Sequence, residues 1–409
     1  MRVLLEPLPR VRTASIGLWF QAGSRDDPPR AGGAAHFLEH LVFKGGRLLG
    51  ARRLAEAMDA LGGQFNAFTT REHTCFHART LGQRLPEALA LIAEMVVSPR
   101  CDPAEVQRER SVILEELSMI ADDPAETADE LFAHALWGEH PLGRPQAGSV
   151  ESVRRLDAGT LRAFHSGHYV GTRCVVAAAG RLQADRLLAA VESTIGGLPP
   201  GSPPPPRIRP VPLPCPRRQI RRSQQAHLVL GAPGPDQGDP QRWTAALFTS
   251  ILGGSPSSRL FQTLREERGL CYDVGASSAE YSDSGEVAVF LATAPSQSRA
   301  AAALVLQEIR RLAAEGPTAA ELDRHRDQLV AAVHMSQDGT EARMSHLGRQ
   351  AVAGLPLFAS AQVVAALRHV SRRAVQTFAR DLGDPADWAA AFVGPQGALP
   401  GPWAWEAET

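Results

Sequence analysis

The stretch Gly196-Gly197-Leu198-Pro199-Pro200, continued by a proline-rich segment as far as Pro216, divides this chain of 409 residues. Ten of the 31 prolines lie between residues 196 and 216. Proline fixes φ and lacks a backbone donor, so neither a helix nor a central strand can run through this stretch. We expect a semi-rigid linker over residues 199–217 between domains at 1–198 and 218–409. The alternative is a long surface loop within one domain, but structureless loops of this length are uncommon.

The composition is that of a folded protein with more than one hydrophobic core. A prior of roughly 150 residues per domain suggests two or three domains. Hydrophobic residues make up 44% and charged residues 21%, which excludes a disordered, collagen-like or small disulfide-stapled chain. Lys and Arg number 43 against 44 Asp and Glu, a net charge of -1. This balance argues against bulk electrostatic capture of nucleic acid or of an anionic membrane.

The five cysteines are odd in number, scattered, and never spaced as C-x-x-C. This pattern argues against a disulfide framework or a cysteine zinc finger and favours a reducing compartment. The N-terminal residues show no long apolar segment before a small-residue cleavage site. No apolar run approaches the roughly 20 residues that span a bilayer. We therefore expect a soluble, cytoplasmic protein.

The two halves open with a similar order of expected elements. In each half an alternating strand precedes a turn-rich segment and then a helical run, over residues 13–21, 23–27 and 34–44 and over residues 226–230, 231–239 and 243–252. Further strands and long helices follow in both halves. Strands mixed with long helices predict an α+β domain that occurs twice.

The segment His36-Phe37-Leu38-Glu39-His40 carries the expected chemistry. On a helix, positions 36, 39 and 40 lie on one face, because i, i+3 and i+4 are neighbours. In these apolar surroundings an uncompensated glutamate and two histidines would cost several kcal/mol. A zinc ion bound by both imidazoles, with the carboxylate facing a zinc-bound water, removes this cost. HxxEH is a known inverted zinc-protease motif. The alternative is two core histidines beside a surface glutamate.

A third metal ligand is expected on a helix that begins near Asp102-Pro103, a plausible cap and first turn. At ~100° per residue, Glu109 and Glu116 lie beside the apolar stripe of this helix, two turns apart on the same side. Glu115 points to the opposite, solvent side. The periodicity therefore selects Glu116 as the carboxylate that can reach a buried metal. Glu109 is expected to orient a ligand histidine or the loop around it.

These residues resemble the pitrilysin and mitochondrial processing peptidase family of zinc peptidases. The likeness covers most of the chain and continues in Gly62-Gly63-Gln64-Phe65-Asn66-Ala67-Phe68-Thr69, in His140-Pro141-Leu142-Gly143, in Gly253-Gly254 through Ser258-Arg259-Leu260-Phe261, and in Arg265 with Gly269-Leu270-Cys271-Tyr272. The resemblance implies two related domains, each a mostly antiparallel sheet with helices packed on one face. It also implies zinc ligation by His36, His40 and Glu116, with Glu39 as the general base.

The resemblance further implies two substrate-contacting regions. An edge strand near Asn66, Ala67 and Phe68 would align an extended peptide, which can add its backbone hydrogen bonds to such an edge. Arg265 and Tyr272 would be the donors to the developing oxyanion, because the family uses an arginine and a tyrosine seven residues apart in the corresponding place. Without the resemblance, an ordinary helix-end arginine and a core tyrosine would be the preferred interpretation.

Long members of this family carry four such domains in one chain and close them like a clam shell. A chain with two domains therefore implies a dimer, either a homodimer or a heterodimer with a related metal-less subunit. We expect a zinc-dependent endopeptidase with one Zn²⁺ per chain that cleaves extended peptides or unfolded segments in an enclosed chamber, without a nucleic-acid or membrane partner. The alternative is a non-catalytic structural or peptide-binding subunit of the same fold.

Other motifs give weaker support for a site. His73, Cys75 and His77 would lie on one face of a strand, but a strand packed in the sheet is the preferred interpretation. The sequence has no G-x-x-x-x-G-K-[ST] and no strand-borne G-x-G-x-x-G, so a nucleotide site lacks support. It also has no G-x-S-x-G elbow, which argues against a serine hydrolase.

Overall fold

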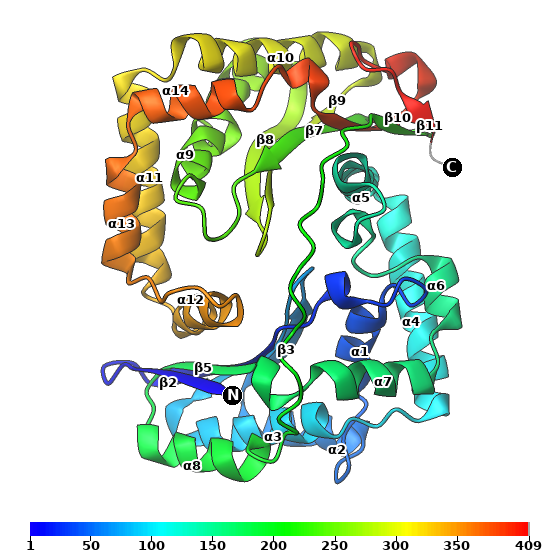
Figure 1. The fold of residues 1–409 in the computed structure, drawn as a ribbon, viewed down its shortest axis with the longest axis vertical. Coiled ribbons are helices and arrows are strands. Elements are labelled where there is room, and N and C mark those ends of the chain that lie inside the picture. Colours follow the sequence, from blue (N-terminus) through cyan, green and yellow to red (C-terminus); the bar gives the residue numbers. More distant parts are fainter. Residues whose placement is uncertain (408–409) are drawn as a thin grey trace. The chain divides into compact units, whose positions relative to one another are not determined.

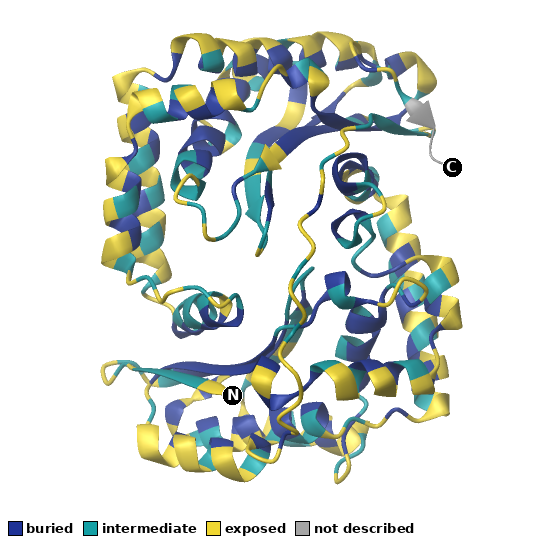
Figure 2. Ribbon diagram, in the orientation of Figure 1, coloured by how far each residue is buried: buried dark blue, intermediate teal, exposed yellow. Residues whose placement is uncertain are grey.

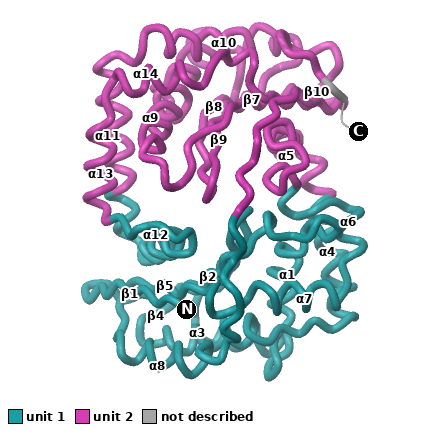
Figure 3. The backbone as a smooth tube through the Cα atoms, viewed as in Figure 1, with its two compact units in different colours: residues 1–117, 145–206, 334–358 teal, residues 118–144, 207–333, 359–409 magenta. Residues whose placement is uncertain are grey.

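The computed structural model describes residues 1–407, which form two compact units, each built around one sheet. Unit 1 contains residues 1–117, 145–206 and 334–358, and unit 2 contains residues 118–144, 207–333 and 359–409 (Figure 3). Each unit thus includes a segment from the opposite half of the sequence, unlike the contiguous domains 1–198 and 218–409 that we predicted. Residues 199–216 contain no helix or strand, and one boundary between the units lies within them.

Unit 1 is built on a five-stranded sheet with the order β1-β5-β2-β4-β3 (Figure 1). Its strands are β1 (Arg2–Pro7), β2 (Thr13–Phe20), β3 (Gln64–Thr69), β4 (Thr74–Leu81) and β5 (Cys174–Gly180). β1 runs parallel to β5, and the other three pairs are antiparallel. Because β3 lies at the end of this order, one side of its backbone is an open sheet edge.

The helices of unit 1 are α1 (Ala34–Val42), α2 (Ala51–Leu61), α3 (Leu85–Val97), α4 (Pro103–Asp122), α6 (Val150–Arg155), α7 (Ala158–His168), α8 (Ala184–Ile195) and α12 (Thr340–Val352). The last residues of α4 belong to unit 2. In both units the inner strands of the sheet are mostly buried, whereas most helices alternate buried and exposed residues (Figure 2). This alternation follows from the helical period, which turns one stripe of each helix toward the core.

Unit 2 repeats this topology in a six-stranded sheet with the order β11-β6-β10-β7-β9-β8. Its strands are β6 (Arg217–Ile220), β7 (Ala226–Gly234), β8 (Cys271–Glu280), β9 (Gly285–Thr293), β10 (Ala389–Gly394) and β11 (Glu406–Ala407). Apart from β11, these strands occupy the same places in the same chain order as the strands of unit 1. The predicted α+β fold with two related, mostly antiparallel sheets is therefore confirmed.

The helices of unit 2 are α5 (Pro124–Trp137), α9 (Arg242–Gly253), α10 (Ser298–Glu315), α11 (Ala319–Ser336), α13 (Ser360–His369) and α14 (Arg372–Asp381). The C-terminal end of α11 belongs to unit 1. Between β8 and α9, residues Phe261–Glu266 form a short π-helix. α5 is the third α-helix after β4, and α12 is the third α-helix after β9, so the two helices are equivalent elements of the two halves.

Helices cover both faces of each sheet, so the expectation of helices on one face was incomplete. In unit 1, α12 packs against β2 so closely that a Cβ on Gly348 would lie 2.2 Å from the ring of Trp19. In unit 2, α5 packs against β7, where a Cβ on Gly231 would lie 2.6 Å from the ring of Phe132. The second face of each sheet is therefore covered by a helix that comes from the opposite half of the sequence.

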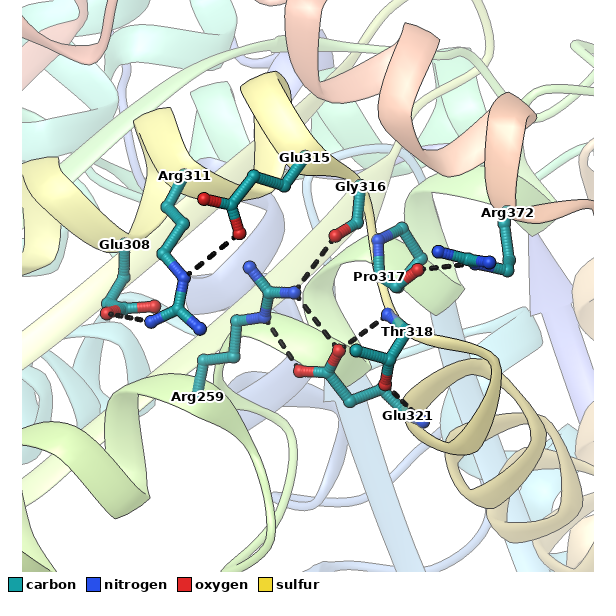
Figure 4. Close-up of polar contacts among 9 residues, drawn as sticks. All are labelled: Arg259, Glu308, Arg311, Glu315, Gly316, Pro317, Thr318, Glu321 and Arg372. Carbon is teal, nitrogen blue, oxygen red and sulfur yellow. Dashed lines mark hydrogen bonds and ion pairs between the residues drawn. The ribbon is translucent and has the colours of Figure 1, made fainter.

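A largely buried ion pair joins Arg259, just before the π-helix of unit 2, to Glu321 of α11 (Figure 4). Arg259, whose side chain is 8% exposed, donates from Nε and Nη2 to the carboxylate of Glu321 at 2.8 and 3.0 Å. Nη2 also donates to the carbonyl of Gly316 at 3.0 Å, and Glu321 accepts from the backbone N–H of Thr318 at 2.7 Å. Burial alone would raise the pKa of Glu321, but the hydrogen bonds from Arg259 and Thr318 lower it to about 2.

We expect Glu321→Gln to lower the free energy of unfolding by about 3 kcal/mol at pH 7, because it leaves the buried Arg259 without a counter-charge. The depressed pKa contributes stability that is complete above the ordinary value of 4.5 and is lost as the pH falls toward about 2. The difference between wild type and variant should therefore shrink over that interval. Urea unfolding at pH 7 and pH 3 measures it. Glu315→Gln, in an exposed ion pair with Arg311, is the control, and an equal loss from both variants would contradict the prediction.

Candidate metal centre

Helix α1 begins at a tightly determined backbone position. Its N-cap residue Gly33 has φ 87°, and a Cβ there would lie 2.4 Å from the carbonyl oxygen of Ala147. The side chain of Asp27 accepts hydrogen bonds from the backbone N–H of Gly33 at 2.7 Å and of Ala35 at 2.9 Å. These contacts satisfy orphan donors at the helix start. Burial raises the pKa of Asp27 to about 7.

The structure brings His36, His40 and Glu116 together. His36 Nε2 lies 3.6 Å from Glu116 Oε1, and His40 Nε2 lies 3.4 Å from Glu116 Oε2. The three donor atoms all lie within 4.8 Å of one another. Ligands bound to one tetrahedral zinc ion at about 2.1 Å lie roughly 3.4 Å apart, so the donor set and its spacing fit such an ion. Helix α4 turns Glu116 toward α1, whereas Glu115 is exposed.

The two histidines differ in their electrostatic surroundings. Burial, followed by the charge of His40, lowers the pKa of His36 to about 4, which keeps its imidazole neutral and able to bind a metal. Burial would also lower the pKa of His40, but the hydrogen bond with Glu109 and the charges of Glu116 and Glu39 raise it. A bound cation would oppose protonation of His40, since metal ligation and proton binding compete for the same nitrogen.

Glu39 lies on the same face of α1 as His36 and His40, beside the end of β3. Burial raises its pKa, against the lowering effect of a hydrogen bond from the Thr69 hydroxyl and of the charge of His40. Thr69 is the last residue of β3 and is 6% exposed. A carboxylate whose pKa is raised is a stronger base than an ordinary one, as a general base requires.

Glu109 connects His40 to a cation. Its Oε1 lies 3.1 Å from His40 Nδ1, and its Oε2 lies 2.6 Å from Lys44 Nζ. The side chain of Glu109 is only 5% exposed. Burial alone would raise the pKa of Glu109, but the hydrogen bonds with His40 and Lys44 and the charge of Lys44 lower it. The contact to Nδ1 leaves Nε2 of His40 directed at Glu116.

The predicted substrate-aligning residues lie on the open edge of the sheet in unit 1. Asn66, Ala67 and Phe68 belong to β3 and pair with His77, Phe76 and Cys75 of β4 on the inner side. Asn66 is exposed. The strand ends at Thr69, which contacts Glu39, so this edge leads to the candidate catalytic carboxylate.

Arg265 and Tyr272 lie together in unit 2. Arg265 Nη1 donates to the backbone carbonyl of Tyr272 at 2.7 Å, and its guanidinium lies 4.7 Å from the ring centroids of both Tyr272 and Phe261. The residue Tyr272 is 74% exposed. The alternative of a core tyrosine is therefore wrong, and the phenol is accessible to a ligand.

His73, Cys75 and His77 do not form a metal-type cluster. Within residues 1–407, the group of His, Cys, Asp and Glu side chains with converging donor atoms consists of His36, His40 and Glu116. The His73 ring instead packs 5.4 Å from Trp19 and 6.1 Å from Phe68. Burial lowers the pKa of His73 to about 4. These contacts are those of a packed strand.

Sequence reasoning missed three residues around the site. Asp27 caps α1, Thr69 contacts Glu39, and Lys44 pairs with Glu109. A usable signal existed for Lys44, which stands one helical turn after His40 and is the only lysine among 43 Lys and Arg residues. Thr69 and Asp27 gave no comparable signal, since their contacts depend on the packing of α1 against segments before and after it.

Two family models match most of the chain. One, described as insulinase (peptidase family M16), matches residues 2–149, and the other, described as the peptidase M16 inactive domain, matches residues 155–329. The first match contains His36, Glu39, His40 and Glu116. None of the helices in the described part of the chain has the length and apolar character that crossing a membrane requires.

Several curated relatives are named uncharacterized zinc proteases. One from Streptomyces coelicolor is 35% identical over 392 residues, covering 93% of this chain and 85% of the relative. One from Mycobacterium tuberculosis H37Rv is 40% identical over 354 residues, covering 85% and 81%. YmxG of Bacillus subtilis is 32% identical over 400 residues, covering 98% and 97%.

Solved structures with lower identity share the fold. A peptidase M16 inactive domain from Pseudomonas fluorescens has a TM-score of 0.90 at 24% identity and covers 96% of each chain. A protease from Helicobacter pylori has a TM-score of 0.89 at 20% identity, covering 96% of this chain and 97% of that one. A chain of complex III from Candida albicans, with Inz-5 bound, has a TM-score of 0.81 at 19% identity, covering 96% and 93%.

Proposed function

Because this chain belongs to peptidase family M16, we propose that it is a zinc-dependent endopeptidase whose catalytic centre is formed by His36, His40, Glu116 and Glu39. The observation that carries the proposal is the convergence of two imidazole nitrogens and one carboxylate within 4.8 Å. Glu39 lies one residue before a ligand histidine, on the same helical face. Two histidines and one carboxylate form a ligand set typical of catalytic zinc.

A bound zinc ion supplies Lewis acidity, which lowers the pKa of water and polarises the scissile carbonyl. The protein supplies the proton transfers. Glu39 accepts a proton from the attacking water and passes it to the leaving amine. The Thr69 hydroxyl donates to Glu39 and orients its carboxylate. Burial raises the pKa of Glu39, which makes it a stronger base than an exposed carboxylate.

The open edge of β3 supports a substrate of extended backbone. A peptide that pairs with Asn66, Ala67 and Phe68 gains main-chain hydrogen bonds that depend little on its sequence. Since β3 ends beside Glu39, such a peptide would pass the catalytic carboxylate. We include Arg265 and Tyr272 as substrate-contacting residues, which the exposure of the phenol supports. That two such chains form a dimer stays a prediction.

A non-catalytic peptide-binding subunit remains the second candidate, because the residues that match the second family model carry the description of an inactive domain. The presence of all three metal-type ligands and of Glu39 in the first half argues against it. The two candidates share the fold and the open strand edge. They differ in whether a bound peptide is cleaved.

The test measures zinc content and peptide hydrolysis on the same preparation. We expect about one zinc ion per chain and cleavage of an internally quenched peptide. A chelator should abolish the cleavage, and added Zn²⁺ should restore it. Stoichiometric zinc without cleavage of a varied peptide set would favour the binding subunit. Absence of zinc binding would contradict the metal centre itself.

A further inference from the structure

Lys44 is the single lysine of this protein, and it lies beside the candidate metal centre. The other Lys and Arg residues in the total of 43 are all arginines. Lys44 follows α1 in a turn in which its backbone N–H donates to the carbonyl of Leu41 at 3.0 Å. Its Nζ lies 2.6 Å from Glu109 Oε2, and its side chain is 30% exposed. The position thus combines a short ion pair with access from solvent.

The geometry divides the carboxylate of Glu109 between two partners. Oε1 faces His40 Nδ1 at 3.1 Å, and Oε2 faces Lys44 Nζ at 2.6 Å. With one oxygen held by a permanent cation, the carboxylate cannot rotate away from the imidazole without breaking a buried ion pair. Its contact to Nδ1 selects the tautomer in which Nε2 of His40 is the free donor to a metal.

A positive charge is needed at this place. The carboxylates of Glu39, Glu109 and Glu116 surround two imidazoles, and a histidine that binds a metal is neutral. Glu109 is 5% exposed, and an ionised carboxylate so far from water is costly unless it is paired. Lys44 provides the fixed charge that pairs with Glu109 whether or not a metal is bound.

A lysine suits this contact better than an arginine does. A guanidinium is a planar fork that matches both oxygens of a carboxylate, whereas an ammonium is a compact charge that can pair with one. His40 already occupies Oε1 of Glu109, so a single oxygen is open. Arginine fills every other Lys or Arg position of the chain, and at position 44 the compact shape of the ammonium fits the single open oxygen.

We propose that Lys44 is a positioning residue of the metal centre, which holds Glu109 so that His40 presents Nε2 to zinc. The inference rests on the proposed zinc site and concerns metal affinity, not turnover. The inference predicts that removing the charge of Lys44 weakens zinc binding. Modifications that keep this charge should leave the zinc affinity nearly unchanged.

The single lysine allows a chemical test on the folded, metal-free protein. Acetic anhydride converts the ε-ammonium to a neutral acetamide, with release of acetate and two protons, whereas reductive methylation with formaldehyde and a borohydride keeps the positive charge. Both reagents also reach the N-terminal amine, so Lys44→Arg treated in the same way is the control. Mass spectrometry gives the extent of modification, and competition with a chromophoric chelator gives the zinc affinity.

We expect acetylation to lower the zinc affinity about 10- to 100-fold, the usual loss when a partner of a metal ligand is removed. Dimethylation should change it less than about 3-fold by the same comparison. Lys44→Gln should match the acetylated protein, and Lys44→Arg should recover part of the loss. Arg52→Gln, which removes an exposed ion pair with Glu56, should leave the affinity unchanged.

Equal zinc affinity of the acetylated and untreated proteins would overturn the inference, as would equal losses from acetylation and dimethylation. Acetylation of folded protein keeps the test valid if Lys44→Gln fails to fold. Zinc binding that depends on Lys44 in a protein without hydrolysis would support the inference while contradicting the peptidase proposal. Untreated protein that binds no zinc would overturn both.

Discussion

Glu39→Gln should lower kcat for peptide hydrolysis by about 10³-fold, within the range of general acid–base contributions. An amide has nearly the same shape as the carboxylate but cannot accept the proton of the attacking water. It can still accept the hydrogen bond from the Thr69 hydroxyl, so the packing between α1 and β3 should persist. The loss should therefore appear in kcat, with little change in KM.

The zinc content of Glu39→Gln separates chemistry from metal loss. Glu39 is not one of the three side chains with converging donor atoms, so the variant should bind about one zinc ion per chain, as wild type should. Initial rates on a quenched peptide and elemental analysis of the same samples make the measurement. A variant that keeps zinc and more than a tenth of the wild-type rate would show that another group accepts the proton.

Glu116→Gln should lower the zinc affinity by more than about 100-fold, beyond the loss usual for a group that only orients a ligand. The carboxylate oxygens lie 3.6 Å from His36 Nε2 and 3.4 Å from His40 Nε2. A neutral amide is a weak metal ligand, and the variant also removes a negative charge that attracts the cation. Hydrolysis should fall in parallel and return only at high zinc concentration.

The adjacent residue provides a matched control. Glu115→Gln makes the same chemical change one position earlier in α4, on an exposed side chain. Helix propensity and net charge change equally in the two variants, so a difference in zinc affinity reports the direction of the side chain. Chelator competition should place Glu115→Gln within about 2-fold of wild type, given that its exposed side chain is not among the converging donors. Equal losses would contradict the assignment of Glu116.

Both experiments examine positions that local helical geometry predicted. The i, i+3 and i+4 spacing in HFLEH places His36, Glu39 and His40 on one face, and a step of ~100° separates Glu116 from Glu115. These relations follow from the backbone of a single helix and need no knowledge of packing. The same holds for residues 199–216, where the prolines exclude helix and strand whatever surrounds them.

Other features depend on contacts between segments far apart in the chain. The ion pair between Lys44 and Glu109 joins the turn after α1 to α4. The contact of Thr69 with Glu39 joins β3 to α1. The preference for a core tyrosine at Tyr272, drawn from the residues alone, was wrong because Tyr272 lies at an irregularity in the pairing of the edge strand β8, between Cys271 and Asp273. The hydrophobic pattern of one segment does not identify the other segment that packs against it.

The sequence by itself therefore determined the two related α+β halves, the absence of helix and strand over residues 199–216 and the face of each helix that carries a metal-type ligand. The reason is that hydrophobic period, proline content and residue spacing act over a few residues. Only the tertiary structure decided the exchange of α5 and α12 between the two sheets, the open edge of β3 and the pairing of Lys44 with Glu109. Those outcomes depend on which surfaces pack together, and that choice is made by the whole chain.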